Sequence, residues 1–167
     1  MLNNIKVRTK ILILSTTMLI LIAIIAGVAY INISNANKNM QFLYQNNLGK
    51  IQYLNESRDY NRGIEADINY IILHVGQKNS QNQKAKEIEE RMKQYDSKFG
   101  QYKTLYLNKT ETQIIPILED NVTKYRVSKQ KIIQFALEGK QKEAMDEYGR
   151  IEPVANSIQS SLEVLAT

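Results

Sequence analysis

The chain has 167 residues, a net charge of +5 and no Cys, which excludes a disulfide framework and thiol chemistry. Three of the positive charges, Lys6, Arg8 and Lys10, lie before the first apolar segment, and the rest of the chain shows no clustered basic face of the kind that binds nucleic acid. With only 2 Pro and 7 Gly, the sequence predicts an all-α protein with a few long helices.

The first predicted element is a transmembrane helix. Residues 11–33 form an uncharged, apolar run of 23 residues, where a helix needs about 20 to cross the hydrocarbon layer. Because Lys and Arg concentrate on the cytoplasmic side, we expect residues 1–10 in the cytoplasm and residues 34–167 outside the bilayer. A cleaved signal peptide with a small-residue site at Gly27 and Ala29 is the alternative, but the apolar run is too long for one and continues past this site.

The remainder predicts an antiparallel four-helix bundle that continues directly from the transmembrane helix. Apolar residues recur at alternating spacings of three and four, which is typical of helices that pack at shallow angles. Four such stretches occur, at residues 34–75, between Ser80 and Asn108, between Thr110 and Gly139, and at residues 141–167. Short breaks between them favour antiparallel neighbours.

Two other patterns in these stretches have simple interpretations. The Tyr residues at apolar positions are expected to pack in the core with their hydroxyls reaching outward: Tyr44, Tyr95, Tyr102, Tyr125 and Tyr148. The charged run at residues 84–93 is interpreted as a solvated helix face with pairs of opposite sign.

The breaks between the stretches have ordinary turn chemistry. Gly76 is predicted to end the first helix as its C-terminal cap, and Ser80 to act as the N-cap of the second. Thr110 and Gln113 fit a capping box at the start of the third helix, and Gly139 separates the third helix from the fourth.

The predicted helix lengths are unequal. Residues 34–75 rise about 63 Å at 1.5 Å per residue, whereas residues 141–167 return only about 40 Å. We therefore expect the chain to be cut before a second transmembrane helix, as a fragment of a longer protein.

No catalytic constellation is visible in the sequence. The only histidine is His74, and without Cys it cannot form a protein-only zinc site of the usual ligand count. The sequence has neither a P-loop nor a GxGxxG motif, and its Ser, Thr and carboxylate residues have no third partner that would orient a base. We therefore expect no enzyme activity, no catalytic residues, no metal site and no cofactor.

A polar gap interrupts the apolar pattern of the first helix. Arg58, Asn61 and Glu65 occupy positions where apolar residues are expected, and Arg62 lies beside them. Counting helical turns places Asn121, which interrupts the pattern of the third helix, at the same level, and Asn156 of the fourth helix nearby. The candidate ligand-binding residues are therefore Arg58, Asn61, Arg62, Glu65, Asn121 and Asn156.

The polar gap has two interpretations. A guanidinium offers paired donors in a planar fork that suits a carboxylate ligand. Alternatively the residues form a structural layer that sets helix register, with Glu65 in an internal ion pair with Arg62 or Arg58.

Two stretches resemble a known family. The opening NIKVRTKI with the segment NANKNMQFLYQNNLGKIQYLNESRDYNRGIEADI, and the later ALEGKQKEAMDEYGRIEPVANSIQSSLEVL, are similar to the N-terminal half of bacterial methyl-accepting chemotaxis proteins with a four-helix-bundle sensor. The likeness covers nearly the whole chain. The same module is also found on sensor histidine kinases and diguanylate cyclases.

The resemblance implies a function in ligand sensing for chemotaxis at a bacterial cell membrane. It implies a homodimer that binds a small anionic ligand, such as an amino or organic acid, directly or through a binding protein, with Arg58 and Arg62 as the arginines of the first helix. The alternatives are the sensor module of a histidine kinase or cyclase, and a membrane-anchored helical adaptor that binds protein rather than a small molecule.

Overall fold

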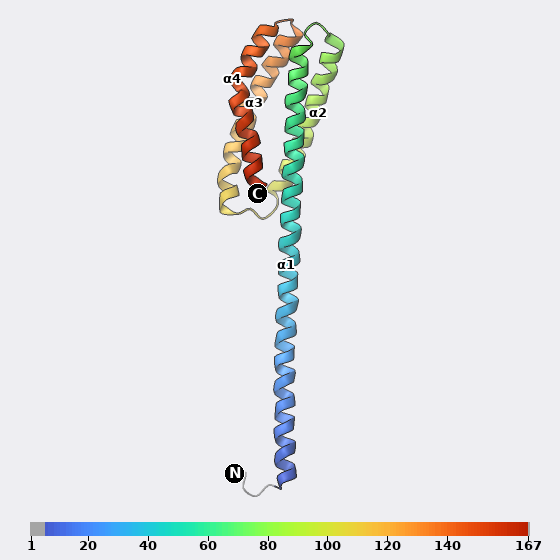
Figure 1. Ribbon diagram of the computed structural model, residues 1–167, viewed down its shortest axis with the longest axis vertical. Helices are drawn as coiled ribbons and strands as arrows, with labels where there is room; N and C mark the ends of the chain where they lie inside the picture. The colour runs from blue at the N-terminus through green and yellow to red at the C-terminus, as the bar shows by residue number, and fades with distance from the viewer. Residues whose placement is uncertain (1–5, 167) are drawn as a thin grey trace. The chain divides into compact units, whose positions relative to one another are not determined.

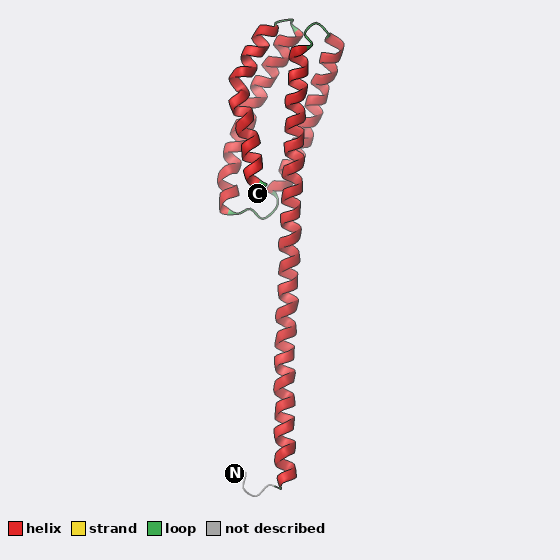
Figure 2. Cartoon of the chain, in the orientation of Figure 1, coloured by secondary structure: helices red, strands yellow, loops and turns green. Residues whose placement is uncertain are grey.

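The computed structural model describes residues 6–166, which form four helices and no strand (Figure 2). The helices are α1 (Val7–Leu73), α2 (Lys78–Lys103), α3 (Lys109–Leu137) and α4 (Gln141–Leu165). The predicted all-α class is therefore confirmed. Half of the predicted cytoplasmic segment, residues 1–5, and the last residue, Thr167, lie outside the described residues.

The chain divides after Gln45 into two compact units. The described part of the first unit is the N-terminal part of α1, whose apolar side chains are exposed. Among the described residues, α1 is the one helix long and apolar enough to cross a membrane, with a mean hydropathy of 2.7 over its most apolar window. Length and composition support the predicted span, although a signal sequence near the N-terminus has the same character.

The hydroxyl groups inside this apolar segment are hydrogen-bonded within the helix. Thr16 Oγ1 donates to the carbonyl oxygen of Leu12 at 2.8 Å, and Thr17 Oγ1 donates to that of Ile13 at 2.8 Å. Ser15 makes the same kind of bond to Leu12. Because a hydrocarbon environment leaves unpaired polar groups unsatisfied, these bonds make the segment compatible with lipid.

The second unit contains the end of α1, from Asn46, together with α2, α3 and α4, which lie side by side as a bundle (Figure 1). All four helices contribute to one core. Its most deeply buried side chains are Leu54, Ile68, Ile71, Ile88, Tyr102, Leu118, Ile132, Ala136, Ala144, Ile158 and Leu162. The predicted spacing of three and four residues accounts for most of these positions, because it places one apolar stripe of each helix toward the others.

The helix C-termini follow the prediction, but the N-termini differ. Gly76 and Gly139 adopt φ of +93° and +83°, a region that L side chains rarely enter, and each follows the end of a helix. The prediction of Ser80 as an N-cap is wrong, because α2 already begins at Lys78 and the Ser80 hydroxyl donates to the carbonyl oxygen of Gln77.

The capping box of α3 is also shifted from its predicted position. Asn108 and Glu111 form it, in place of Thr110 and Gln113, with the Glu111 backbone N–H donating to Asn108 Oδ1 at 2.9 Å. Asn and Glu at these positions are as good a capping pair as Thr and Gln. Glu111 also accepts hydrogen bonds from Lys50 and Tyr102, and these contacts favour the capping box at Asn108 and Glu111.

Two glutamines occupy the helix ends at the Gly76 end of the bundle. The fully buried Gln81 donates through Nε2 to the carbonyl oxygens of Ile71 at 3.0 Å and Ala136 at 3.2 Å. Gln141 donates to the carbonyl oxygen of Ile72 at 3.0 Å. These bonds join carbonyls at the C-terminal ends of α1 and α3 to side chains of α2 and α4; the Ala136 oxygen also accepts from the Gly139 backbone N–H.

Candidate functional site

The polar residues of α1 lie in the middle of the bundle unit. Asn61 is buried, and its Nδ2 donates to Glu65 Oε1 at 3.1 Å. Glu65 and Arg58 are half-buried. The Arg58 Nε is buried and has no hydrogen-bond partner among the described residues. The polar gap predicted from the sequence is therefore a partly buried layer with one unpaired guanidinium donor.

Arg62 points to α4. With the Gln159 amide oriented so that its oxygen faces α1, that oxygen accepts from Arg62 Nε at 3.1 Å and from Nη2 at 3.2 Å. The guanidinium therefore has a neutral partner and remains exposed. A neutral amide leaves its positive charge uncompensated by a contacting anion.

The internal ion pair considered from the sequence is not formed. Among the described residues, no ion pair joins Glu65 to Arg62 or Arg58. Burial raises the pKa of Glu65, and the hydrogen bond from Asn61 and the charge of Arg62 only partly oppose this effect. The charges of Arg58, Arg62 and Glu65 are therefore not neutralised by an ion pair between these residues.

The other two candidate residues are less central. Asn121 Nδ2 donates to Ser157 Oγ at 3.0 Å and so links α3 to α4. Asn156 is exposed on α4. In the part of the chain that the structure describes, no hydrogen bond joins either of them to the α1 residues.

A small cavity lies beside the layer. It has a water-accessible volume of about 20 Å³ and is lined by Asn61, Ile64, Met92, Tyr95, Val122, Tyr125 and Arg126. The hydroxyls of Tyr95 and Tyr125 are buried and lack partners among the described residues, so the prediction that they reach outward is wrong. Burial raises the pKa of both phenols, which therefore stay neutral.

A charged cluster between α1 and α2 was missed by the pattern analysis. Asp67 of α1 is buried and accepts from Lys84 Nζ at 2.9 Å and Arg91 Nε at 3.0 Å. Gly63 lies under the Arg91 guanidinium, where a Cβ atom would approach Nη1 to 2.6 Å. The interpretation of residues 84–93 as a purely solvated face is therefore wrong for these two cations.

A second polar cluster joins α1, α2 and α3 around Glu111. Its carboxylate accepts from Lys50 Nζ at 2.8 Å, from Tyr102 Oη at 3.1 Å and from the Asn108 backbone N–H at 2.6 Å. Nearby, Asn46 accepts from the Tyr106 backbone N–H at 3.2 Å. Burial alone would raise the pKa of Glu111, but these hydrogen bonds and the Lys50 charge outweigh it and lower the pKa.

The arrangement contains hydrogen-bond donors for a small anion. No group of three His, Cys, Asp or Glu side chains that could hold a metal ion occurs among residues 6–166. The layer instead contains the cationic side chains of Arg58 and Arg62 beside the half-buried carboxyl of Glu65. Such a layer can bind or orient a polar molecule, and it has no oriented nucleophile and base.

Comparisons with known proteins give one match. The model of a family described as a four helix bundle sensory module for signal transduction matches residues 4–167. Comparisons with curated proteins and with solved structures give no match. The matched family is a sensory signalling module rather than an enzymatic domain.

Proposed function

The chain belongs to the family of four-helix-bundle sensory modules of chemotaxis receptors, and on this premise we propose that it is the ligand-sensing module of a bacterial membrane chemoreceptor. The observation that carries the proposal is the polar layer of α1. Within residues 6–166, the buried Arg58 Nε has no hydrogen-bond partner, and the exposed Arg62 guanidinium donates to the neutral Gln159 amide. A partly buried guanidinium without an anionic partner costs free energy, which a bound anion would offset.

The proposed ligand is a small carboxylate, such as an amino or organic acid. Arg58 and Arg62 donate to its carboxylate, and the ligand takes the place of Gln159 on Arg62. Asn61, Asn121 and Asn156 are secondary candidates because their amides can donate or accept, and Glu65 borders the site through its bond with Asn61.

The proposed topology follows from the basic N-terminus. Residues 1–10 are cytoplasmic, residues 11–33 span the membrane, and residues 34–167 face outward, where a ligand from outside the cell reaches the bundle. The family and the apolar segment together support membrane association.

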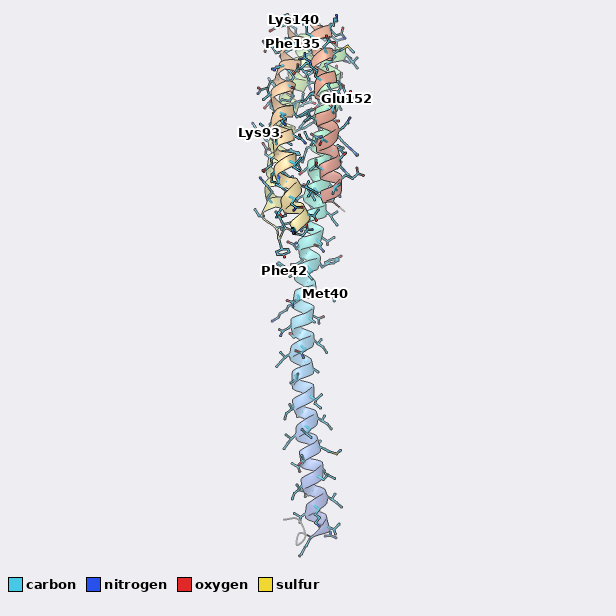
Figure 3. All side chains as sticks on the ribbon, turned by 90° about the vertical axis from the view of Figure 1, so that its left-hand side faces the viewer. Met40, Phe42, Lys93, Phe135, Lys140 and Glu152 are labelled. Atoms are coloured by element: carbon cyan, nitrogen blue, oxygen red, sulfur yellow. The ribbon has the colours of Figure 1, made fainter. Side chains whose placement is uncertain are left out.

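The proposed assembly is a homodimer through α1. Large apolar side chains are exposed along this helix before the core begins: Met40, Phe42, Leu43, Tyr44, Leu48 and Ile51. Figure 3 shows Met40 and Phe42 extending from the helix. An exposed apolar stripe on a long helix is the kind of surface that pairs with a second helix.

Ligand screening of the full chain in lipid nanodiscs tests the proposal. We expect one or more amino or organic acids to raise the thermal unfolding midpoint of the wild type, Arg58→Ala to lack this rise, and Arg62→Ala to show a smaller one. Lys142→Ala, which removes an exposed cation of α4, is the control and keeps the rise. If no compound shifts the wild type, and Arg58→Ala unfolds at a much lower temperature, the layer is structural and the proposal fails.

The type of output domain is tested separately by sequencing the gene beyond the codon for Thr167. A second apolar span followed by HAMP and methylation helices after Thr167 supports a chemoreceptor. A kinase or cyclase domain in that place assigns a different output to the same sensor, and a stop codon favours the adaptor.

A further inference from the structure

Glu65 differs from the other acidic residues inside the bundle. The three buried carboxylates, Asp67, Glu111 and Glu147, each form an ion pair, with Lys84 and Arg91, with Lys50, and with Arg150 respectively. Glu65 is half-buried, and its only hydrogen bond within residues 6–166 comes from the neutral amide of Asn61. A carboxylate removed from water without a cationic partner is destabilised relative to its protonated form.

The groups around Glu65 come from all four helices. Arg62 of α1 lies close enough to act on it electrostatically, but contacts Gln159. From α3, the buried hydroxyl of Tyr125 lacks a partner among the described residues, and its ionisation is opposed first by burial and then by the nearby charge of Glu65. Tyr125 lines the same small cavity as Asn61, whose amide donates to Glu65, so the Tyr125 hydroxyl is an acceptor in the neighbourhood of a protonated Glu65 carboxyl.

The other two helices add tyrosine side chains, while Arg91 of α2 is paired with Asp67. Tyr148 of α4 accepts a hydrogen bond from Asn69 at 3.4 Å, and Tyr95 of α2 lines the small cavity that Asn61 and Tyr125 also line. Burial keeps Tyr95 and Tyr125 neutral. Arg126 of α3 also lines this cavity, but it donates to Asp96. Arg62 is the cation whose charge favours the ionised form of Glu65.

We propose that Glu65 is a proton-binding site of the sensor bundle, where the carboxyl takes up a proton from water and then donates a hydrogen bond to the Tyr125 hydroxyl oxygen. The step transfers one proton and neutralises the half-buried negative charge of Glu65. It ties α1 to α3, and it leaves the polar layer with the positive charges of Arg58 and Arg62 alone. This proton site does not depend on the proposed carboxylate ligand, because it rests on Glu65, Asn61 and Tyr125 alone.

The proposal fixes the sign of a pH effect. Because the pKa of Glu65 is raised in the folded state, its contribution to stability is fully present below the unfolded pKa of about 4.3 and is lost as the pH rises through the folded pKa. This is opposite to the effect of Glu111, whose pKa is lowered.

The direct test is a carboxyl ¹³C NMR titration of glutamate-labelled full chain in nanodiscs, with Glu65→Gln identifying the resonance. We expect the Glu65 midpoint to lie above the exposed value of about 4.3, and to move down toward it in Tyr125→Phe. A Glu65 midpoint at or below that value overturns the proton site. A midpoint that Tyr125→Phe leaves unchanged or raises overturns the bond to Tyr125.

Thermal unfolding supplies a second readout. Relative to Glu65→Gln, which mimics the protonated carboxyl, the wild type should lose stability as the pH rises through the Glu65 midpoint. Glu90→Gln, which changes an exposed glutamate of α2, is the matched control and keeps the wild-type pH dependence. Identical pH dependence in the wild type and Glu65→Gln contradicts the proposal, and the NMR titration of the wild type decides the matter if the variant does not fold.

Discussion

At the scale of single residues, the acidic side chains inside the bundle differ in whether a cationic side chain pairs with them. Asp67 and Glu111 are buried with cationic partners and multiple donors, whereas Glu65 shares its layer with arginines that it does not contact. The sequence predicted that Arg58, Asn61 and Glu65 interrupt the apolar pattern of the first helix; in the structure Asn61 is buried, and Arg58 and Glu65 are half-buried. It could not predict that Arg62 would contact Gln159, because a helix position offers partners on its own helix and on the neighbouring helix at similar cost.

A prediction at this scale concerns Glu111. Replacing it by Gln leaves Lys50 without its anionic partner in a site where both side chains are about 10 % exposed, and breaking such a buried pair costs about 3–5 kcal/mol. Because the folded pKa of Glu111 is lowered, its stabilisation is present above about pH 4.3 and is lost as the pH falls through the folded pKa.

Thermal unfolding of the full chain between about pH 3 and pH 7 checks this expectation. This range runs from about one unit below the unfolded pKa to nearly three units above it. We expect Glu111→Gln to lower the midpoint strongly at neutral pH and to weaken its fall in acid. Glu152→Gln, on the exposed face of α4, is the control and should behave as the wild type. A Glu111→Gln protein as stable as the control at neutral pH would show that the Glu111 cluster contributes little.

At the scale of elements, apolar periodicity was sufficient to predict the helices and their shared core. It was insufficient where polar side chains are buried. Gln81 and Asp67 occupy interior positions that a hydrophobic pattern excludes, and their partners are backbone carbonyls and cations of other helices. Capping was also misplaced, because several Ser, Thr and Asn residues near each break fit the same local motif and tertiary contacts select among them.

The contact between α1 and α2 gives a prediction about glycine. In a helix interior, Gly→Ala normally stabilises by about 1 kcal/mol, which we expect for Gly149→Ala because nothing lies near its added Cβ. At Gly63 the Cβ would approach Arg91 Nη1 to 2.6 Å and Cδ to 3.1 Å, so the guanidinium must shift, which disturbs its bond to Asp67. We expect Gly63→Ala to gain less stability than Gly149→Ala, since the weakened bond offsets part of the helix propensity.

Chemical denaturation of the two variants beside the wild type measures this difference. Asp67 keeps Lys84 as a partner in Gly63→Ala, so the protein should still fold. Equal stabilisation by both substitutions would mean that the Arg91 contact with Asp67 contributes no net stability.

At the scale of the whole molecule, α1 is one helix from Val7 to Leu73 and belongs to both compact units. Its N-terminal part has the composition of a membrane span and its C-terminal part carries the polar layer, so the helix covalently links the proposed anchor to the proposed site. The sequence predicted that the first bundle helix, from residue 34, continues directly from the transmembrane helix.

Topology is testable in intact cells because the chain has no Cys. Single cysteines at Asn3→Cys and Asn79→Cys should react with a membrane-impermeant thiol reagent only at position 79, since the proposed topology places the basic N-terminus inside. Disrupting the cells should make both react. Labelling of both positions from outside, or a mature protein that begins at Tyr30, would contradict the anchored topology.

The central claim is that the arginines of α1 bind a small carboxylate, and isothermal titration calorimetry tests it most directly. With the acid that most stabilises the wild type, Arg58→Ala should lose about 2–5 kcal/mol of binding free energy, a weakening of at least about 30-fold, because its Nε is buried. Arg62→Ala, which removes an exposed guanidinium, should weaken binding by a smaller factor, and Lys142→Ala, which removes an exposed cation of α4, should bind as the wild type does. Equal affinity in the wild type and both arginine variants would contradict the account, because the ligand would then bind elsewhere on the bundle.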